Sequence, residues 1–152
     1  MSFGYNQLDD ETTYASSTEL SHLLINSVAD GGNLLLNIGP KANGEIPDIQ
    51  KQRLIEIGQW LEINGGAIFG SHKLELNALT ASDGTFVRLT QGADGSTYAM
   101  ILATAQDSFT IPGLPSGTVE LLGSNEPVQR DVDTITLPAV RTDQPALTLR
   151  IK

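Results

Sequence analysis

The sequence predicts an α+β fold, in which a helix, a strand and a second helix precede an antiparallel β-sandwich. In the first half, apolar side chains recur at helical spacing on both sides of an uninterrupted leucine run, Leu34–Leu36. In the second half, the apolar period becomes two, and glycines and prolines separate short runs. The change falls between about Gly70 and Ala81, so we divide the chain into residues 1–72 and 73–152.

The first helix is predicted to begin after Ser16. Ser16 and Glu19 have the spacing of a capping box, in which the serine hydroxyl accepts from the Glu19 N–H and the glutamate reaches back. The apolar positions that follow at helical spacing are Leu20, Leu23, Leu24 and Val28. His22 lies off this apolar stripe, so we interpret it as a solvated side chain.

The leucine run and the turn after it come next. Leu34–Leu36, flanked by glycines, is typical of a short and fully buried strand. Asn43-Gly44 favours a turn, because both residues tolerate positive φ. Pro47 suits the first position of a helix, and Gly65 can supply the left-handed residue that ends that helix.

Apolar residues mark one face of this second helix. Leu54, Ile57 and Leu61 share the face, and Trp60 lies beside it. We therefore expect Trp60 to anchor the core or the contact between the two parts of the chain. Gly58 costs about 1 kcal/mol relative to alanine in a helix, and we expect close packing against a neighbour to explain it.

Six apolar runs predict the strands of the sandwich. They are Phe86–Leu89, Thr97–Ala103, Phe109 with Ile111, Val119 with Leu121, Ile135 with Leu137, and Leu147 with Leu149 and Ile151. A hairpin turn that contains Gly92 and Gly95 separates the first two runs. The last run alternates with polar residues, which is typical of a strand buried on one face.

Composition and charge exclude several classes of function. Nine basic residues against eighteen acidic ones give a net charge of −9, which argues against nucleic acid or an anionic membrane as a partner. The absence of cysteine excludes disulfides and thiolate chemistry. His22 and His72 make a weak case for a metal site, so we expect no metal and no other cofactor. No run could span a bilayer and no signal peptide is evident, so we expect a soluble chain and leave its compartment open.

Five motifs follow one another along the central stretch. They are Asn33-Leu34-Leu35-Leu36-Asn37-Ile38-Gly39-Pro40, Asn43-Gly44, Ile57-Gly58-Gln59-Trp60-Leu61, Asn64-Gly65 and Ala67-Ile68-Phe69-Gly70. Together they resemble the end of the catalytic barrel of the α-L-fucosidase family of glycoside hydrolases. Phe3-Gly4-Tyr5 resembles the family's Trp-Gly-Tyr segment, and Leu121-Leu122-Gly123 resembles part of its C-terminal β-domain. The resemblance implies that residues 1–72 are a helix-strand-helix remnant of a (β/α)8 barrel.

The same resemblance implies a retaining hydrolase that releases terminal α-L-fucose from fucosylated glycans or fucosides. This chemistry uses one carboxylate as nucleophile and a second as acid/base, about 5 Å apart. The family carries both carboxylates on earlier strands that have no counterpart here, so no catalytic residue is carried over. Phe3 alone is carried over, as a substrate-binding ring that suits the methyl group of a 6-deoxy sugar.

Four acidic residues remain as candidates if the chain hydrolyses glycosides by itself. Glu45 with one of Asp9, Asp10 or Glu11 is the hypothetical pair, because these loops would reach the reactive face of a barrel. The competing interpretation is that all four are solvated loop charges.

The leucine run also bears on assembly. A lone apolar strand with open edges is an aggregation hazard, so we expect the helical part to pack on the β-domain or, preferably, on another copy as a homo-oligomer. The alternative to an enzyme is a non-catalytic, truncated C-terminal module with a structural or carbohydrate-binding role.

Overall fold

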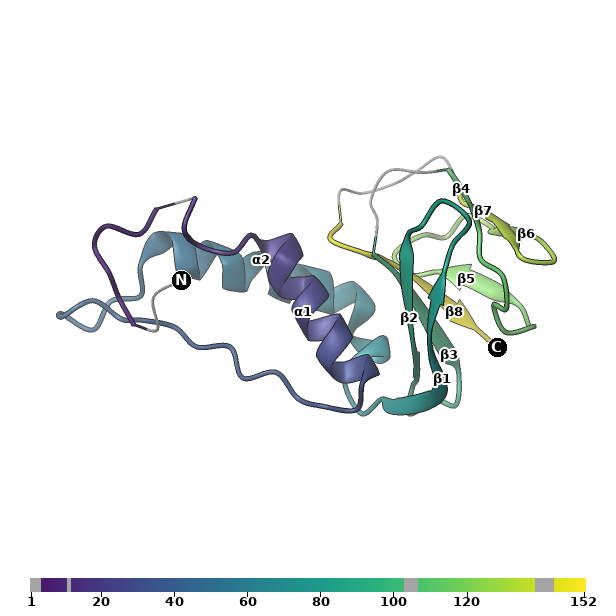
Figure 1. Ribbon diagram of the computed structural model, residues 1–152, viewed down its shortest axis with the longest axis horizontal. Coiled ribbons are helices and arrows are strands. Elements are labelled where there is room, and N and C mark those ends of the chain that lie inside the picture. The colour runs from purple at the N-terminus through teal and green to yellow at the C-terminus, as the bar shows by residue number, and fades with distance from the viewer. Residues whose placement is uncertain (1–3, 11, 103–106, 139–143) are drawn as a thin grey trace.

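The protein is arranged in three layers, as seen in a computed structural model that describes residues 4–10, 12–102, 107–138 and 144–152 (Figure 1). Two helices form the first layer, a five-stranded sheet forms the second, and a three-stranded sheet forms the third. All strand pairs are antiparallel. The predicted fold class, α+β with an antiparallel β-sandwich, is confirmed.

The helical layer consists of α1 (Ser17–Ala29), α2 (Asp48–Asn64) and a single 3-10 turn, η1 (Gly65–Ala67). The capping box before α1 is confirmed: the Glu19 N–H donates to the Ser16 hydroxyl at 3.2 Å, and the Ser16 N–H donates to the Glu19 carboxylate at 2.8 Å. The role predicted for Gly65 is wrong. Gly65 is right-handed (φ −57°, ψ −27°) and continues into η1, and the left-handed residue is Gly70 (φ 66°).

The sandwich contains eight strands within the described residues. They are β1 (His72–Thr80), β2 (Phe86–Gln91), β3 (Thr97–Ile101), β4 (Ser108–Thr110), β5 (Val119–Leu121), β6 (Gln129–Asp131), β7 (Thr134–Thr136) and β8 (Leu147–Ile151). The larger sheet has the order β1-β2-β3-β8-β5, and the smaller has β4-β7-β6. Each of the six predicted runs contains a strand, although Ala103 lies outside the described residues. Sequence reasoning missed β1 and β6.

Both faces of the larger sheet are covered. One face packs against the smaller sheet and forms the main core, whose fully buried members include Leu89, Ala99, Ile101, Phe109, Ile135 and Leu149. The other face packs against the helices in a second cluster that contains Ile25, Trp60, Ala67, Ile68, Tyr98, Met100 and Ala146. The prediction that the last strand is buried on one face is therefore wrong, because the helical layer leaves Thr148 only 1% exposed.

Hydrogen bonds between distant segments tie the helices to the sheet. The Trp60 indole N–H donates to the Ala146 carbonyl at 3.0 Å, which confirms Trp60 as an anchor between the two parts of the chain. The His22 Nε2 lies 2.7 Å from the Pro145 carbonyl, so the prediction of a solvated His22 is wrong. Asp30, at the end of α1, pairs with Arg88 of β2.

The leucine run does not form the predicted buried strand. Leu35 is 94% exposed, and no strand is assigned to residues 33–39. Exposure alternates along this segment: Leu34, Leu36 and Ile38 are half-buried, and Asn33, Leu35 and Asn37 are exposed. The cause is visible in Figure 1, where the segment runs alongside the helices with no described strand beside it.

Candidate functional site

A small hollow lies where three segments of the helical layer meet beside Leu20 of α1. The N-terminal loop contributes Gly4 and Tyr14, the leucine-rich segment contributes Leu36–Gly39, and α2 contributes Gln50, Arg53 and Leu54. Apolar side chains make up most of the wall. These residues include the end of the segment whose motif pointed to a hydrolase, so the hollow is the candidate functional site.

Gln50 connects the three segments through both ends of its amide. The Gly39 N–H donates to the Gln50 Oε1 at 2.9 Å, and the Gln50 Nε2 donates to the Tyr14 hydroxyl at 3.1 Å. The three residues are thereby held in fixed positions around the hollow. Sequence reasoning missed Gln50, because an amide in the first turn of a helix gives no signal until its partners, 11 and 36 residues away, are known.

Gly39 has to be glycine because another backbone crosses it. A Cβ atom on Gly39 would lie 2.3 Å from the Tyr5 nitrogen and 2.5 Å from the Gly4 carbonyl carbon. Only the missing side chain lets the N-terminal loop approach the end of the leucine-rich segment so closely. Phe3, the predicted substrate-binding residue, directly precedes this crossing and lies outside the described residues.

Two of the acidic candidates hold the N-terminal loop in shape. The Asn6 amide donates to Asp9 at 3.1 Å. Asp10 accepts from the Thr12 hydroxyl at 2.7 Å and from the Thr12 N–H at 2.9 Å, and these bonds lower the pKa of Asp10 below its usual value. A lowered pKa keeps the carboxylate ionised, which does not suit a general acid. Glu11 lies outside the described residues.

Glu45 lies apart from these acids. It is exposed on the turn that follows the leucine-rich segment, where it lines an open hollow with Lys41, Asp48 and Lys51. Neither Glu45 nor Asp9 or Asp10 lines the hollow beside Gly39. The hypothetical catalytic pair therefore stays a prediction.

Two features are absent from the described ranges. No group of three or more His, Cys, Asp or Glu residues there is placed to hold a metal ion. No helix among those residues is long and apolar enough to cross a membrane.

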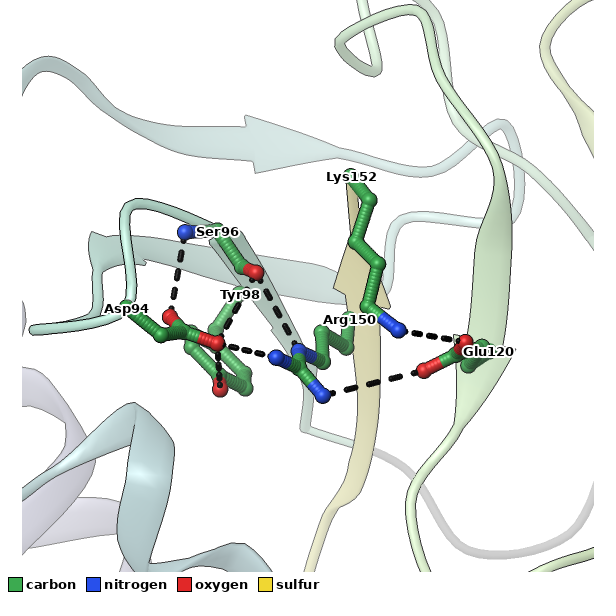
Figure 2. A network of polar contacts seen from close by, with 6 residues as sticks. All are labelled: Asp94, Ser96, Tyr98, Glu120, Arg150 and Lys152. Carbon is green, nitrogen blue, oxygen red and sulfur yellow. Dashed lines mark hydrogen bonds and ion pairs between the residues drawn. The ribbon is translucent and has the colours of Figure 1, made fainter.

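A second polar cluster covers the helix-facing side of β3, β8 and β5. Figure 2 shows its members, which are Asp94, Ser96, Tyr98, Glu120, Arg150 and Lys152. Asp94 accepts from the Ser96 N–H and hydroxyl, both at 3.0 Å, and from the Tyr98 hydroxyl at 3.2 Å, and it pairs with Arg150. Arg150 also faces Glu120 at 3.9 Å, and Lys152 pairs with Glu120 at 2.7 Å.

The charges of this cluster compensate one another. The hydrogen bonds from Ser96, followed by the bond and charge of Arg150, lower the pKa of Asp94 to about 2. Burial raises the pKa of Tyr98, so its phenol remains a donor to Asp94 at neutral pH. Because each charged side chain in the cluster has an oppositely charged partner, we assign this cluster a structural role.

Comparison with known proteins points to one family. The α-L-fucosidase family model matches residues 1–66. The α-L-fucosidase of Dictyostelium discoideum is 34% identical over 99% of this chain, which spans 32% of that relative. The plasma α-L-fucosidase of Rattus norvegicus is 33% identical over 84% of this chain and 28% of its own length.

Solved structures agree with these sequence relatives. The crystal structure of Thermotoga maritima α-fucosidase superposes with a TM-score of 0.85 at 33% identity, and it covers 99% of this chain and 37% of its own. The same enzyme in complex with fucose gives a TM-score of 0.86. This chain therefore spans about a third of the length of the relatives that it matches.

Proposed function

Because the chain belongs to the α-L-fucosidase family, we propose that it serves the retaining hydrolysis of terminal α-L-fucosides, in a site completed only by assembly with further polypeptide. The observation that carries the proposal is the arrangement around Gly39. Gln50 and the close backbone of Gly4 and Tyr5 hold the leucine-rich segment extended at the hollow, although no described strand supports it.

The reaction requires groups that this site does not bring together. A retaining hydrolase needs a carboxylate nucleophile at the anomeric carbon and a second carboxyl group that protonates the leaving oxygen, about 5 Å apart. None of the described acids lines the hollow beside Gly39. We propose that assembly supplies the missing carboxylate geometry, with Glu45 and one of Asp9, Asp10 or Glu11 as the candidates within this chain.

The contribution of this chain to substrate binding follows from the crossing at Gly39. Phe3 is one residue before Gly4, whose carbonyl carbon lies against Gly39. We propose that the Phe3 ring contacts the methyl group of L-fucose, which is an apolar surface on an otherwise polar sugar.

Turnover of an aryl α-L-fucoside tests the proposal. The purified chain is separated by gel filtration, and each fraction is assayed, with the expectation that turnover is confined to assembled species. Glu45→Gln is expected to abolish the turnover, whereas Glu75→Gln on the exposed edge strand β1 serves as a matched control and leaves it unchanged. Turnover by a monomeric fraction, or undiminished rates in Glu45→Gln and all three loop-acid amides, contradicts this assignment.

The alternative is a non-catalytic module with a structural or carbohydrate-binding role. The observation behind it is that no described acid lines the hollow beside Gly39. The alternative predicts no turnover in any fraction. Binding of L-fucose in calorimetry, lost in Phe3→Ala, would then indicate a carbohydrate-binding role rather than a purely structural one.

A further inference from the structure

The chain contains two Asn-Gly pairs, Asn43-Gly44 and Asn64-Gly65. In such a pair the backbone nitrogen of the glycine can attack the side-chain carbonyl of the asparagine, because no Cβ atom crowds the approach. The reaction converts asparagine to aspartate without a cofactor. The structure places the two pairs in different surroundings, so their reactivities are expected to differ.

Asn43 and Gly44 lie in an exposed turn that is shaped by bonds within residues 41–45. The Lys41 N–H donates to the Glu45 carbonyl at 2.8 Å, and the Gly44 N–H donates to the Lys41 carbonyl at 2.9 Å. The second bond has to open before the Gly44 nitrogen can react, and hydrogen bonds in exposed turns open at little cost in free energy. No atom lies within 4 Å of the position that a Gly44 Cβ would occupy. The nitrogen can therefore be reached.

The Asn43 side chain is already held in place for this attack. The Glu45 N–H donates to the Asn43 Oδ1 at 3.1 Å, which turns the side chain back over the backbone that follows it. When the Gly44 nitrogen bonds to the side-chain carbon, negative charge develops on Oδ1. A donor aimed at that oxygen stabilises this charge, so the turn positions both the nucleophile and a donor for the oxyanion.

Asn64 and Gly65 have the opposite surroundings at the end of α2. Asn64 is 0% exposed, and its amide nitrogen donates to the Trp60 carbonyl at 2.9 Å and to the Gln144 Oε1 at 3.2 Å. The Gly65 N–H donates to the Leu61 carbonyl. Both the leaving nitrogen and the attacking nitrogen are therefore bound, and neither is released until the end of α2 unfolds.

We propose that Asn43 is a site of spontaneous deamidation in the folded protein, and that the fold protects Asn64. The Gly44 nitrogen gives its proton to a solvent base and bonds to the side-chain carbon of Asn43. The bond from that carbon to Nδ2 breaks, and Nδ2 takes a proton from water and leaves as ammonia, which forms a cyclic imide. Water then adds to one of the two imide carbonyls and opens the ring to aspartate or isoaspartate.

Either product changes the open hollow that Glu45 lines with Lys41, Asp48 and Lys51. The new carboxylate adds one negative charge to a chain whose net charge is −9. Isoaspartate also carries the main chain through the side-chain carbon, so the backbone gains an atom and the bonds between Lys41 and Glu45 lose their register. The modification requires neither assembly nor turnover, so it does not rest on the proposed function.

Tryptic mapping by mass spectrometry tests the proposal on the purified chain. Trypsin cleaves after Lys41, Lys51, Arg53 and Lys73, so the two pairs fall on separate peptides, 42–51 and 54–73. After incubation in mildly alkaline buffer, peptide 42–51 is expected to have deamidated at least about tenfold faster than peptide 54–73, which corresponds to about 1.4 kcal/mol in the free energy of opening. Its products are expected to be a mixture of aspartate and isoaspartate, which chromatography separates.

Two controls separate the effect of the fold from that of the local sequence. Asn43→Gln lengthens the side chain by one methylene, which disfavours ring closure, and it is expected to abolish the conversion of peptide 42–51. In guanidinium chloride the rate at Asn64 is expected to rise toward that at Asn43, because unfolding releases both bound nitrogen atoms. Circular dichroism confirms that the chain incubated without denaturant stays folded.

Several outcomes would overturn the proposal. They are equal conversion of the two peptides in the folded chain, conversion of peptide 42–51 that persists in Asn43→Gln, and a difference between the peptides that denaturant leaves unchanged. A folded chain in which neither peptide is converted also contradicts it, since the turn would then protect Asn43 as the helix protects Asn64.

Discussion

Asp94 is a surface carboxylate whose hydrogen bonds make its protonation depend on folding. Its pKa in the folded protein is about 2, below the ordinary value of 3.8. Since the folded-state pKa is depressed, the stabilisation is fully present above about pH 4 and is lost as the pH falls through 2. Asp94→Asn is expected to lower stability at pH 7 and to flatten the decline between pH 4 and pH 2.

Urea denaturation at a series of pH values measures this effect. Asp131→Asn, which changes an exposed carboxylate on β6, is the matched control and is expected to leave the pH dependence unchanged. Equal pH dependence in wild type and Asp94→Asn would show that the ion pairs around Asp94 do not persist in solution.

Among single residues, those set by a local sequence pattern could be predicted, and those set by a distant contact could not. The capping box at Ser16 and the anchoring Trp60 were predictable because a local pattern encodes each of them. His22 was not, because its acceptor, Pro145, is 123 residues away. Gln50 was missed for the same reason, so local patterns gave the elements around the candidate site but not the contacts between them.

At the scale of the element, Gly58 departs from what the sequence predicted. We expected a close neighbour to explain a glycine within α2, but no atom lies within 4 Å of the position that its Cβ would occupy. Gly58→Ala is therefore expected to stabilise the protein by about 1 kcal/mol, because alanine loses less backbone entropy in a helix.

Thermal or urea unfolding checks this value, with Gln59→Ala as a control at the adjacent exposed position. A destabilised Gly58→Ala variant would indicate that this side of α2 forms a close contact that the single chain does not contain.

The two strands that escaped prediction share a physical cause. β1 is an edge strand whose register shifts between Lys73 and Ala78, and its alternating apolar residues are only partly covered: Leu74 is half-buried and Leu76 is exposed. β6 is a polar edge strand, Gln129–Asp131, without an apolar residue. Strands that bury a face on the main core, such as β2 and β8, alternate apolar and polar residues, and β3 is an apolar run, so both patterns can be recognised in the sequence. The fold class was therefore predictable, and the edges of the sheets were not.

The leucine run shows the opposite error, because a buried strand was predicted there and is not formed. Its sequence is that of a buried strand, and its backbone is extended, but burial requires neighbours that the described structure does not supply. The local sequence indicates which structure a segment adopts once other elements cover it. It does not encode whether the covering elements belong to the same chain.

At the scale of the whole molecule, the helical layer and the larger sheet share one apolar cluster. Trp60, Ile25 and Ile68 pack on Tyr98 and Met100 of β3, and the Thr90 hydroxyl donates to the Ala67 carbonyl at 2.9 Å. The division into residues 1–72 and 73–152 stays a prediction, and the shared cluster gives it a measurable consequence. We expect both parts to unfold in one transition.

Trp60 fluorescence reports the helical layer, and the circular dichroism of the strands reports the sandwich. Their urea midpoints are expected to coincide. A chain restricted to residues 73–152 is expected to be less stable than the full chain, because Tyr98 and Met100 lose their cover. Separate midpoints, or an equally stable truncated chain, would show that the two parts are independent domains.

The contacts of Gln50 also make the arrangement of the candidate site depend on one side chain. Its amide oxygen accepts from the Gly39 N–H, and its amide nitrogen donates to the Tyr14 hydroxyl. Loss of this amide would therefore release the end of the leucine-rich segment and the N-terminal loop together.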